Sequence, residues 1–107
     1  MSIAVIQPQE LDAPSQDFLK NHDAVDDFGK LCEIVRECFP QLVRLDTRLE
    51  QDVYEAWRVQ LVLVVCLPVG CSFESLKPQQ AEYYQRYLET VPRSKIPLFN
   101  LTFDFLE

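Results

Sequence analysis

Apolar and polar side chains alternate along residues 53–67, and the alternation changes half-way along the stretch. In the first half one face is apolar, while the other carries Arg58 and Gln60. From Leu61 to Leu67 every side chain is apolar. Successive side chains of a strand point to opposite faces of a sheet, so the stretch predicts a central strand that becomes more buried toward its C-terminal end.

Two other segments repeat with a period of two and predict further strands. Apolar residues alternate with charged ones over Leu42–Glu50, and Phe or Leu alternates with Asn, Thr and Asp over residues 99–105. The first segment also suits a helix, but the central strand needs a partner. We therefore favour a hairpin with its turn at residues 50–52, and we expect Ile3–Ile6 to form a fourth, short strand.

A spacing of three and four residues predicts the first helix within residues 15–39. Its apolar stripe consists of Val25, Phe28, Leu31, Cys32, Val35, Cys38 and Phe39. We expect Asp23 to cap its N-terminus, Pro40 to end it and Gly29 to mark a close approach to the sheet. Residues 7–20 are expected to be a loop or irregular.

A second helix is predicted between two helix-breaking segments. It begins with Ser75 as its N-cap and runs to about Val91, where Pro92 stops it. The spacing assigns an inward stripe to Ala81, Tyr84, Leu88 and Val91 and leaves Tyr83 and Tyr87 on the flank.

The order of these segments predicts the fold class. Strand, helix, strand, strand, helix and strand follow one another in a single domain of residues 1–107, which is the βαββαβ order of the ferredoxin-like plait. We therefore expect an α+β protein with two helices packed on one face of a four-stranded antiparallel sheet. If Ile3–Ile6 is not a strand, the sheet has three strands.

Charge narrows the range of partners. The chain has 17 acidic residues against 10 Lys and Arg, which gives a net charge of −7, and the basic residues are scattered. Without a positively charged stripe, binding to nucleic acid or to an anionic membrane is disfavoured. The longest apolar run, residues 61–69, is too short to span a bilayer, and no targeting segment is visible. We expect a cytosolic protein.

The four cysteines lack the spacing of a metal site. Cys32 and Cys38 are six residues apart, Cys66 and Cys71 are five apart, and His22 is distant from both pairs. We interpret the thiols as small buried side chains, with a redox pair of Cys66 and Cys71 as the alternative.

No catalytic arrangement is evident in the sequence. His22 is expected to be a surface side chain, and two glycines cannot build a phosphate-binding loop. The carboxylates of residues 50–55 lack the spacing of a calcium loop and leave at most a weak divalent-ion site. We assign no catalytic, cofactor-binding or metal-binding residue.

The aromatic and apolar residues outside the predicted core indicate a binding role. We expect a small acidic regulatory or protein-interaction subunit without catalytic activity, which binds a protein partner or forms a homodimer. Val62, Val64 and Cys66 would lie on the open face of the sheet, where an apolar patch requires a cover. The candidate interaction surface consists of Arg58, Gln60, Val62, Val64, Tyr83, Arg86 and Tyr87.

Two other functions stay open on the sequence. One is a small-molecule-sensing domain of ferredoxin-like fold, with a pocket between helices and sheet lined by Trp57 and tyrosines. The other is a thiol-dependent enzyme with Cys71 or Cys38 as its nucleophile.

Overall fold

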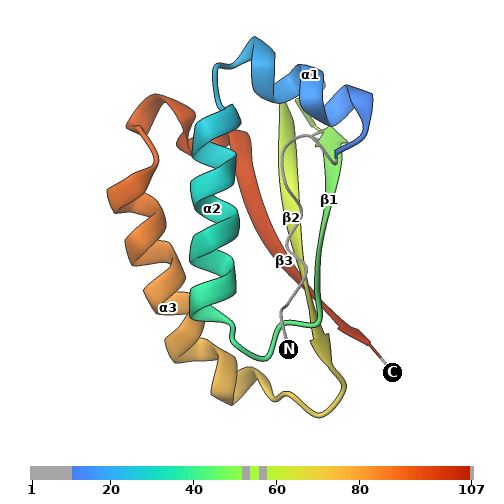
Figure 1. Ribbon diagram of the computed structural model, residues 1–107, viewed down its shortest axis with the longest axis vertical. Helices are drawn as coiled ribbons and strands as arrows, with labels where there is room; N and C mark the ends of the chain where they lie inside the picture. Colours follow the sequence, from blue (N-terminus) through green and yellow to red (C-terminus); the bar gives the residue numbers. More distant parts are fainter. Residues whose placement is uncertain (1–10, 52–53, 56–57, 107) are drawn as a thin grey trace.

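Helices lie on one face of a three-stranded sheet in the computed structural model, which describes residues 11–51, 54–55 and 58–106 (Figure 1). In chain order the elements are α1 (Ala13–Asn21), α2 (Val25–Cys38), β1 (Arg44–Gln51), β2 (Val59–Pro68), α3 (Phe73–Thr90), the 3-10 helix η2 (Arg93–Leu98) and β3 (Phe99–Leu106). The predicted α+β class is confirmed.

The sheet has the order β1-β2-β3, so β2 is central, as predicted. β1 pairs with β2 in the antiparallel sense, with Leu45 facing Val65. β3 pairs with β2 in the parallel sense, with Leu101 facing Leu63. The prediction of a wholly antiparallel sheet is therefore wrong for β3. Because α3 and η2 return the chain to the end of the sheet where β2 begins, β3 runs in the same direction as β2.

The ferredoxin-like arrangement is not confirmed. That plait separates the two parallel strands of each βαβ unit by another strand. Here β2 and β3 are direct hydrogen-bonded neighbours. The proposed strand Ile3–Ile6 lies outside the described residues.

The hairpin differs from its prediction at both ends of the turn. Gln51, expected in the turn, belongs to β1. β2 begins only at Val59, and Tyr54, Glu55 and Arg58 lie outside the strands. The predicted strand residues Val53, Ala56 and Trp57 fall outside the described part of the chain.

The N-terminal region contains a helix that the sequence prediction missed. Residues 13–20, expected to be loop, lie in α1, where the Asp12 carboxylate accepts a hydrogen bond of 2.9 Å from the Ser15 backbone N–H. Pro14 stands in the first turn, where a missing N–H costs nothing. The N-cap residue Asp12 and the proline in the first turn therefore mark this helix in the sequence more clearly than its apolar residues do.

Three local assignments in the other helices were also wrong. Asp23 does not cap α2: it adopts a left-handed backbone with φ 52°, and Ala24 is the N-cap. Ser72, not Ser75, caps α3, and its hydroxyl accepts a hydrogen bond of 3.2 Å from the Ser75 N–H. Gly29 marks no close approach, since an added Cβ would meet nothing within 4 Å.

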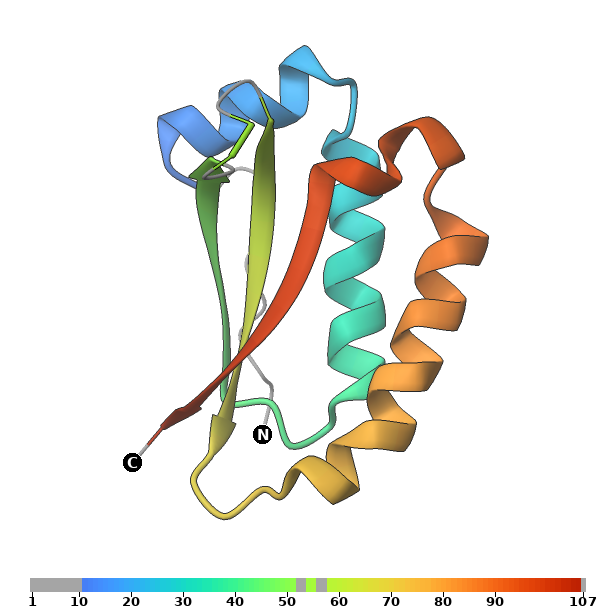
Figure 2. The same ribbon diagram turned by 180° about the vertical axis from the view of Figure 1, so that it is seen from behind.

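The main core lies between the sheet and the helices. Figures 1 and 2 show α2 and α3 side by side over one face of the sheet and α1 across its end. Phe28 and Leu31 of α2 meet Leu45 and Leu63 in this core, and all four side chains are fully buried. Within the described residues, no helix has both the length and the apolar character needed to cross a membrane.

Candidate ligand-binding cleft

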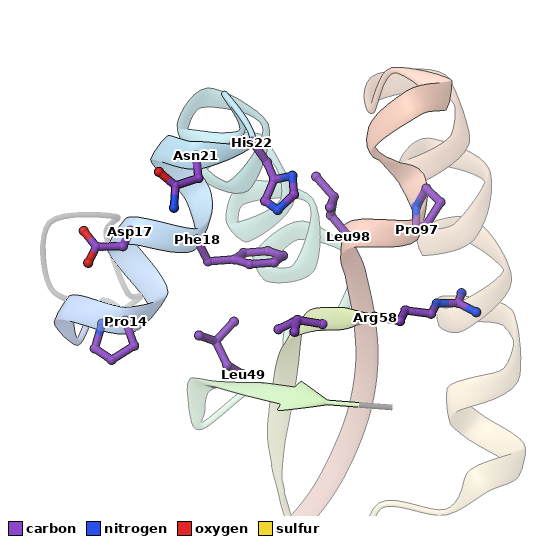
Figure 3. Close-up of a pocket in the computed structure, with 10 residues that line it drawn as sticks. Pro14, Asp17, Phe18, Asn21, His22, Leu49, Arg58, Pro97 and Leu98 are labelled. Carbon is purple, nitrogen blue, oxygen red and sulfur yellow. The ribbon is translucent and has the colours of Figure 1, made fainter. Parts of the chain in front are cut away.

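A cleft of about 740 Å³ lies at the end of the sheet where β1 finishes and β2 starts (Figure 3). α1 forms one wall, the end of η2 forms another, and the strand ends form the floor. The lining side chains among the described residues are Pro14, Asp17, Phe18, Asn21, His22, Leu49, Arg58, Val59, Pro97 and Leu98.

The α1 wall presents an aromatic pair to the cleft. Phe18 and His22 are four residues apart and therefore lie on the same side of the helix. Their ring centroids are 4.7 Å apart, and Figure 3 shows both side chains pointing toward the strand ends. Asp17 and Asn21 of α1 also line the cleft. The wall thus combines an aromatic pair with polar side chains.

The η2 wall is fixed to the sheet and to α3 by hydrogen bonds to its backbone. The Gln60 side-chain amide donates to the Pro97 carbonyl at 3.0 Å, and the Tyr87 hydroxyl donates to the Ile96 carbonyl. These bonds precede Leu98, whose side chain faces α1 across the cleft. Gln60 and Tyr87, both predicted to belong to an interaction surface, therefore position a wall of the cleft.

A lysine ties the start of η2 to the turn between α1 and α2. The Lys95 ammonium lies 2.9 Å from the Asp27 carboxylate and also donates to the Asp23 carbonyl. The hydrogen bond to Asp27 is the largest influence on Lys95 and raises its pKa. Because this turn joins α1 to α2, the contact sets the distance between the two walls.

The lining favours a ligand that is mainly apolar. Val59 is among the lining residues, Leu49 lies in the floor, and Phe18 and Leu98 face each other above it. The Arg58 guanidinium points away from these side chains and lies 3.8 Å from the Glu55 carboxylate. The imidazole of His22, beside Phe18, can donate or accept a hydrogen bond, and Asn21 adds a second polar group to the lining.

Tyr83 and Tyr87 do not form the surface predicted for them. Both are buried between α3 and α2, with their rings stacked at 5.9 Å. Burial raises the pKa of Tyr87 to about 12 and raises that of Tyr83 further above its usual value. Of the stripe predicted to face inward, Ala81, Tyr84 and Leu88 are exposed, whereas Val91 is buried as predicted.

The remaining predicted surface residues are engaged within the chain. Arg86 joins α3 to α2 through a 2.8 Å ion pair with Glu37. Val62 and Val64 are only 2% and 8% exposed, although no helix of the described residues covers their face of the sheet. Each lies on the middle strand between side chains of β1 and β3, such as Arg48 opposite Val62. These two side chains are therefore largely shielded from solvent in the single chain, and a partner on this face stays a prediction.

The thiols fit the predicted buried role at three positions. Cys32, Cys38 and Cys66 are buried and Cys71 is half-buried, and all four are free. Burial is the main cause that raises the pKa of the Cys32 thiol to about 12, and it also raises the pKa values of Cys38 and Cys66. Within residues 11–51, 54–55 and 58–106, no group of three or more His, Cys, Asp or Glu is placed to hold a metal ion.

Sequence reasoning missed most of the cleft. It left Phe18 without a role and assigned no function to Leu98. His22 is exposed, as predicted, and it also lines the cleft. The available signal was the Asp12-Ala13-Pro14-Ser15 segment, which combines an N-cap with a proline in the first turn.

Comparison with protein-family models, curated proteins and solved structures gave no match.

Proposed function

We propose that the protein is a small-molecule-binding regulatory domain without catalytic activity of its own. The cleft between α1 and η2 carries this proposal. Its volume of about 740 Å³ lies within the range of roughly 300–1,000 Å³ usual for ligand sites. Such sites are lined mainly by apolar and aromatic side chains with a few polar groups, and this lining has that character.

The lining supports a compact aromatic or aliphatic ligand with one hydrogen-bonding group. Phe18, Val59 and Leu98 offer apolar contacts to the body of such a molecule. His22 offers a hydrogen bond at the α1 wall. Since the Arg58 guanidinium points away from the cleft, the site offers little to a ligand with a large negative charge.

The environment of Cys38 argues against its use as a nucleophile. A cysteine nucleophile acts as the thiolate and needs a lowered pKa. Burial instead raises the pKa of Cys38, one of the two nucleophiles considered from the sequence. A cytosolic location stays a prediction from the sequence.

Three small probes test the proposal and its ligand class. We expect indole, which is neutral and aromatic, to cause saturable NMR shifts at α1 and η2 in isotope-labelled protein. Benzoate and benzylamine report the preferred charge. The proposal fails if none of the three gives saturable shifts, or if the shifts map elsewhere.

A cleft-filling variant provides a matched control. Leu98→Trp places an indole ring in the cleft and should weaken the binding of the best probe by about tenfold or more. Leu88→Trp makes the same change on the outward face of α3 and should leave binding unchanged. Equal affinity in the two variants would show that the probe binds outside this cleft.

A second candidate function, protein interaction, rests on the outward face of α3. Tyr84 and Leu88 are 41% and 62% exposed and lie four residues apart on one side of the helix. Tyrosine is enriched in protein interfaces, and paired apolar groups at this spacing suit a groove on a partner.

A bait carrying Tyr84→Ala and Leu88→Ala tests this second function. It should lose a partner that the wild-type bait retains from its native source, while its melting temperature stays unchanged. A control bait with Glu82→Ala and Gln85→Ala, also exposed on α3, should retain that partner. If all three baits retain the same proteins, this face of α3 is not the interface.

A further inference from the structure

One face of β1 carries alternating positive and negative side chains, so the strand can pair with a second copy of itself through opposite charges. Arg44, Asp46, Arg48 and Glu50 alternate in sign along one face of the strand. All four are substantially exposed, and they pair in sequence order, with Arg44 and Asp46 joined at 2.9 Å and Arg48 and Glu50 at 3.0 Å. The face therefore presents a row of alternating charges.

Among the described residues, β1 is hydrogen-bonded to β2 alone and forms one border of the sheet (Figure 1). The opposite edge of an outer strand presents a row of backbone N–H and C=O groups that can pair with another strand. In a closed dimer with twofold symmetry, a strand that meets its own copy does so in the antiparallel sense.

Successive side chains of a strand alternate between the two faces of the sheet, and this limits the registers in which two copies of β1 can pair. Facing residues must send their side chains to the same side of the sheet, so the twofold axis passes through a residue rather than between two residues. With the axis at Thr47, Arg44 faces the second copy's Glu50 and Asp46 faces the second copy's Arg48. Every charged residue of residues 44–50 then faces its opposite.

Moving the twofold axis by one residue from Thr47 places like charges opposite one another. With the axis at Asp46, Arg44 faces the second copy's Arg48, and Asp46 faces itself. With the axis at Arg48, Asp46 faces the second copy's Glu50, and Arg48 faces itself. Like charges directly opposite one another destabilise a strand pair. An axis at Leu45 or Leu49 avoids these clashes but leaves a much shorter overlap.

The helix-covered face of β1 also suits the register at Thr47. Leu45 would face the second copy's Leu49, and Thr47 would face its own copy. Apolar pairs and Thr–Thr pairs are both favourable across strands. The charge register and the apolar register therefore coincide.

We propose that this protein forms a twofold homodimer in which β1 pairs with the β1 of a second copy, with Thr47 on the axis. The two sheets then join into one six-stranded sheet. The open-face patch that first suggested a dimer is already covered within the chain, so the edge rather than the face is the dimer interface. This inference is independent of the proposed cleft.

Charge reversal at one facing pair provides the test, read by sedimentation equilibrium at low ionic strength. Wild-type protein should be a dimer that weakens as salt is added. In an Asp46→Arg dimer, the new arginine at position 46 faces Arg48 of the second copy, and this clash occurs twice. In an Arg48→Asp dimer, the new aspartate at position 48 faces Asp46 of the second copy, again twice. Each variant alone should therefore dissociate about tenfold or more readily than wild type.

Mixing the two variants restores both facing pairs. The arginine introduced at position 46 of one chain meets the aspartate introduced at position 48 of the other, and the unchanged Arg48 meets the unchanged Asp46. We expect the mixture to form a heterodimer with affinity close to that of wild type. The matched controls are Glu74→Arg and Lys77→Asp, which reverse an exposed ion pair on α3 and should leave the wild-type dimer intact.

A second facing pair keeps the test independent of one position. Arg44→Glu and Glu50→Arg should behave in the same way, monomeric alone and dimeric together, and urea unfolding shows whether each variant is folded. A monomeric wild-type protein overturns the proposal, as does a dimer that survives the reversals. Mixtures that fail to associate overturn the register.

Discussion

Replacing Tyr87 with Phe tests how the η2 wall of the cleft is held. The Tyr87 side chain is 6% exposed, stacks on Tyr83 and donates its hydroxyl hydrogen to the Ile96 carbonyl. Phe keeps the ring and its packing and removes only the hydroxyl. The substitution therefore isolates one hydrogen bond between α3 and η2.

The structure sets the size of the effect. Leaving a buried carbonyl without a donor costs about 1–3 kcal/mol. The Ile96 carbonyl, however, also accepts a hydrogen bond from the Phe99 backbone N–H, so it keeps one partner in the variant. We therefore expect a loss of about 1 kcal/mol in the free energy of unfolding, the usual net value of one hydrogen bond. In a domain of this size, that lowers the melting temperature by about 4–8 °C.

Urea unfolding followed by circular dichroism measures this loss. Tyr84→Phe is the control, because Tyr84 precedes Tyr87 by less than one turn but is largely exposed. It should change the free energy of unfolding by less than about 0.5 kcal/mol. The reasoning is refuted if the two variants are equally stable, or if Tyr87→Phe matches wild type.

The same substitution should alter the alkaline dependence of stability. Burial raises the pKa of Tyr87 from 10.0 to about 12. Between these two values the unfolded chain has released the Tyr87 proton and the folded chain has kept it, so the free energy of unfolding falls as pH rises. Below pH 10 the group contributes no slope. Tyr87→Phe should reduce this alkaline slope. The remainder is due to other groups whose pKa burial raises, among them Tyr83 and Cys32.

Four further predictions concern Gly29, Gly70, Lys95 and the cysteines. Gly29→Ala should raise the free energy of unfolding by about 0.5–1 kcal/mol, because α2 gains helix propensity and the new Cβ meets no atom within 4 Å. Gly70→Ala should lower the free energy of unfolding by about 1 kcal/mol or more, because φ is 111° at this position. Urea unfolding should therefore show changes of opposite sign for the two glycine variants. Lys95→Met should lower the urea midpoint, since it leaves the Asp27 carboxylate without its ammonium partner, whereas Lys95→Arg should restore part of the loss. In native protein at neutral pH, Cys71 should react first with a thiol reagent, while Cys32 should react only on unfolding; rapid labelling of Cys32 would contradict its burial.

Elements with a strong local signal could be predicted from the sequence. The alternation over residues 99–105 and the valine-rich run of β2 correspond to real strands, and the ambiguous segment Leu42–Glu50 is the strand β1. α1 was missed because it is short and its apolar stripe is weak, so only its cap residues distinguish it from a loop.

The candidate cleft could not be predicted, because its walls come from α1, the strand ends and η2, which are distant in sequence. No single segment carries a signal for such a site. Phe18 and Leu98 are each ordinary apolar residues until the fold brings them face to face.

The sequence by itself determined the period, polarity and order of the segments, since these depend on neighbours along one chain segment. It also determined the alternating charges of β1 and the net negative charge. Two features emerge only in the folded chain: β3 runs parallel to β2, and Tyr83 rather than Tyr84 faces the core. The burial of Val62 within the single chain is a third. These outcomes depend on contacts between segments far apart in sequence, where two local arrangements of similar energy are separated only by what packs against them.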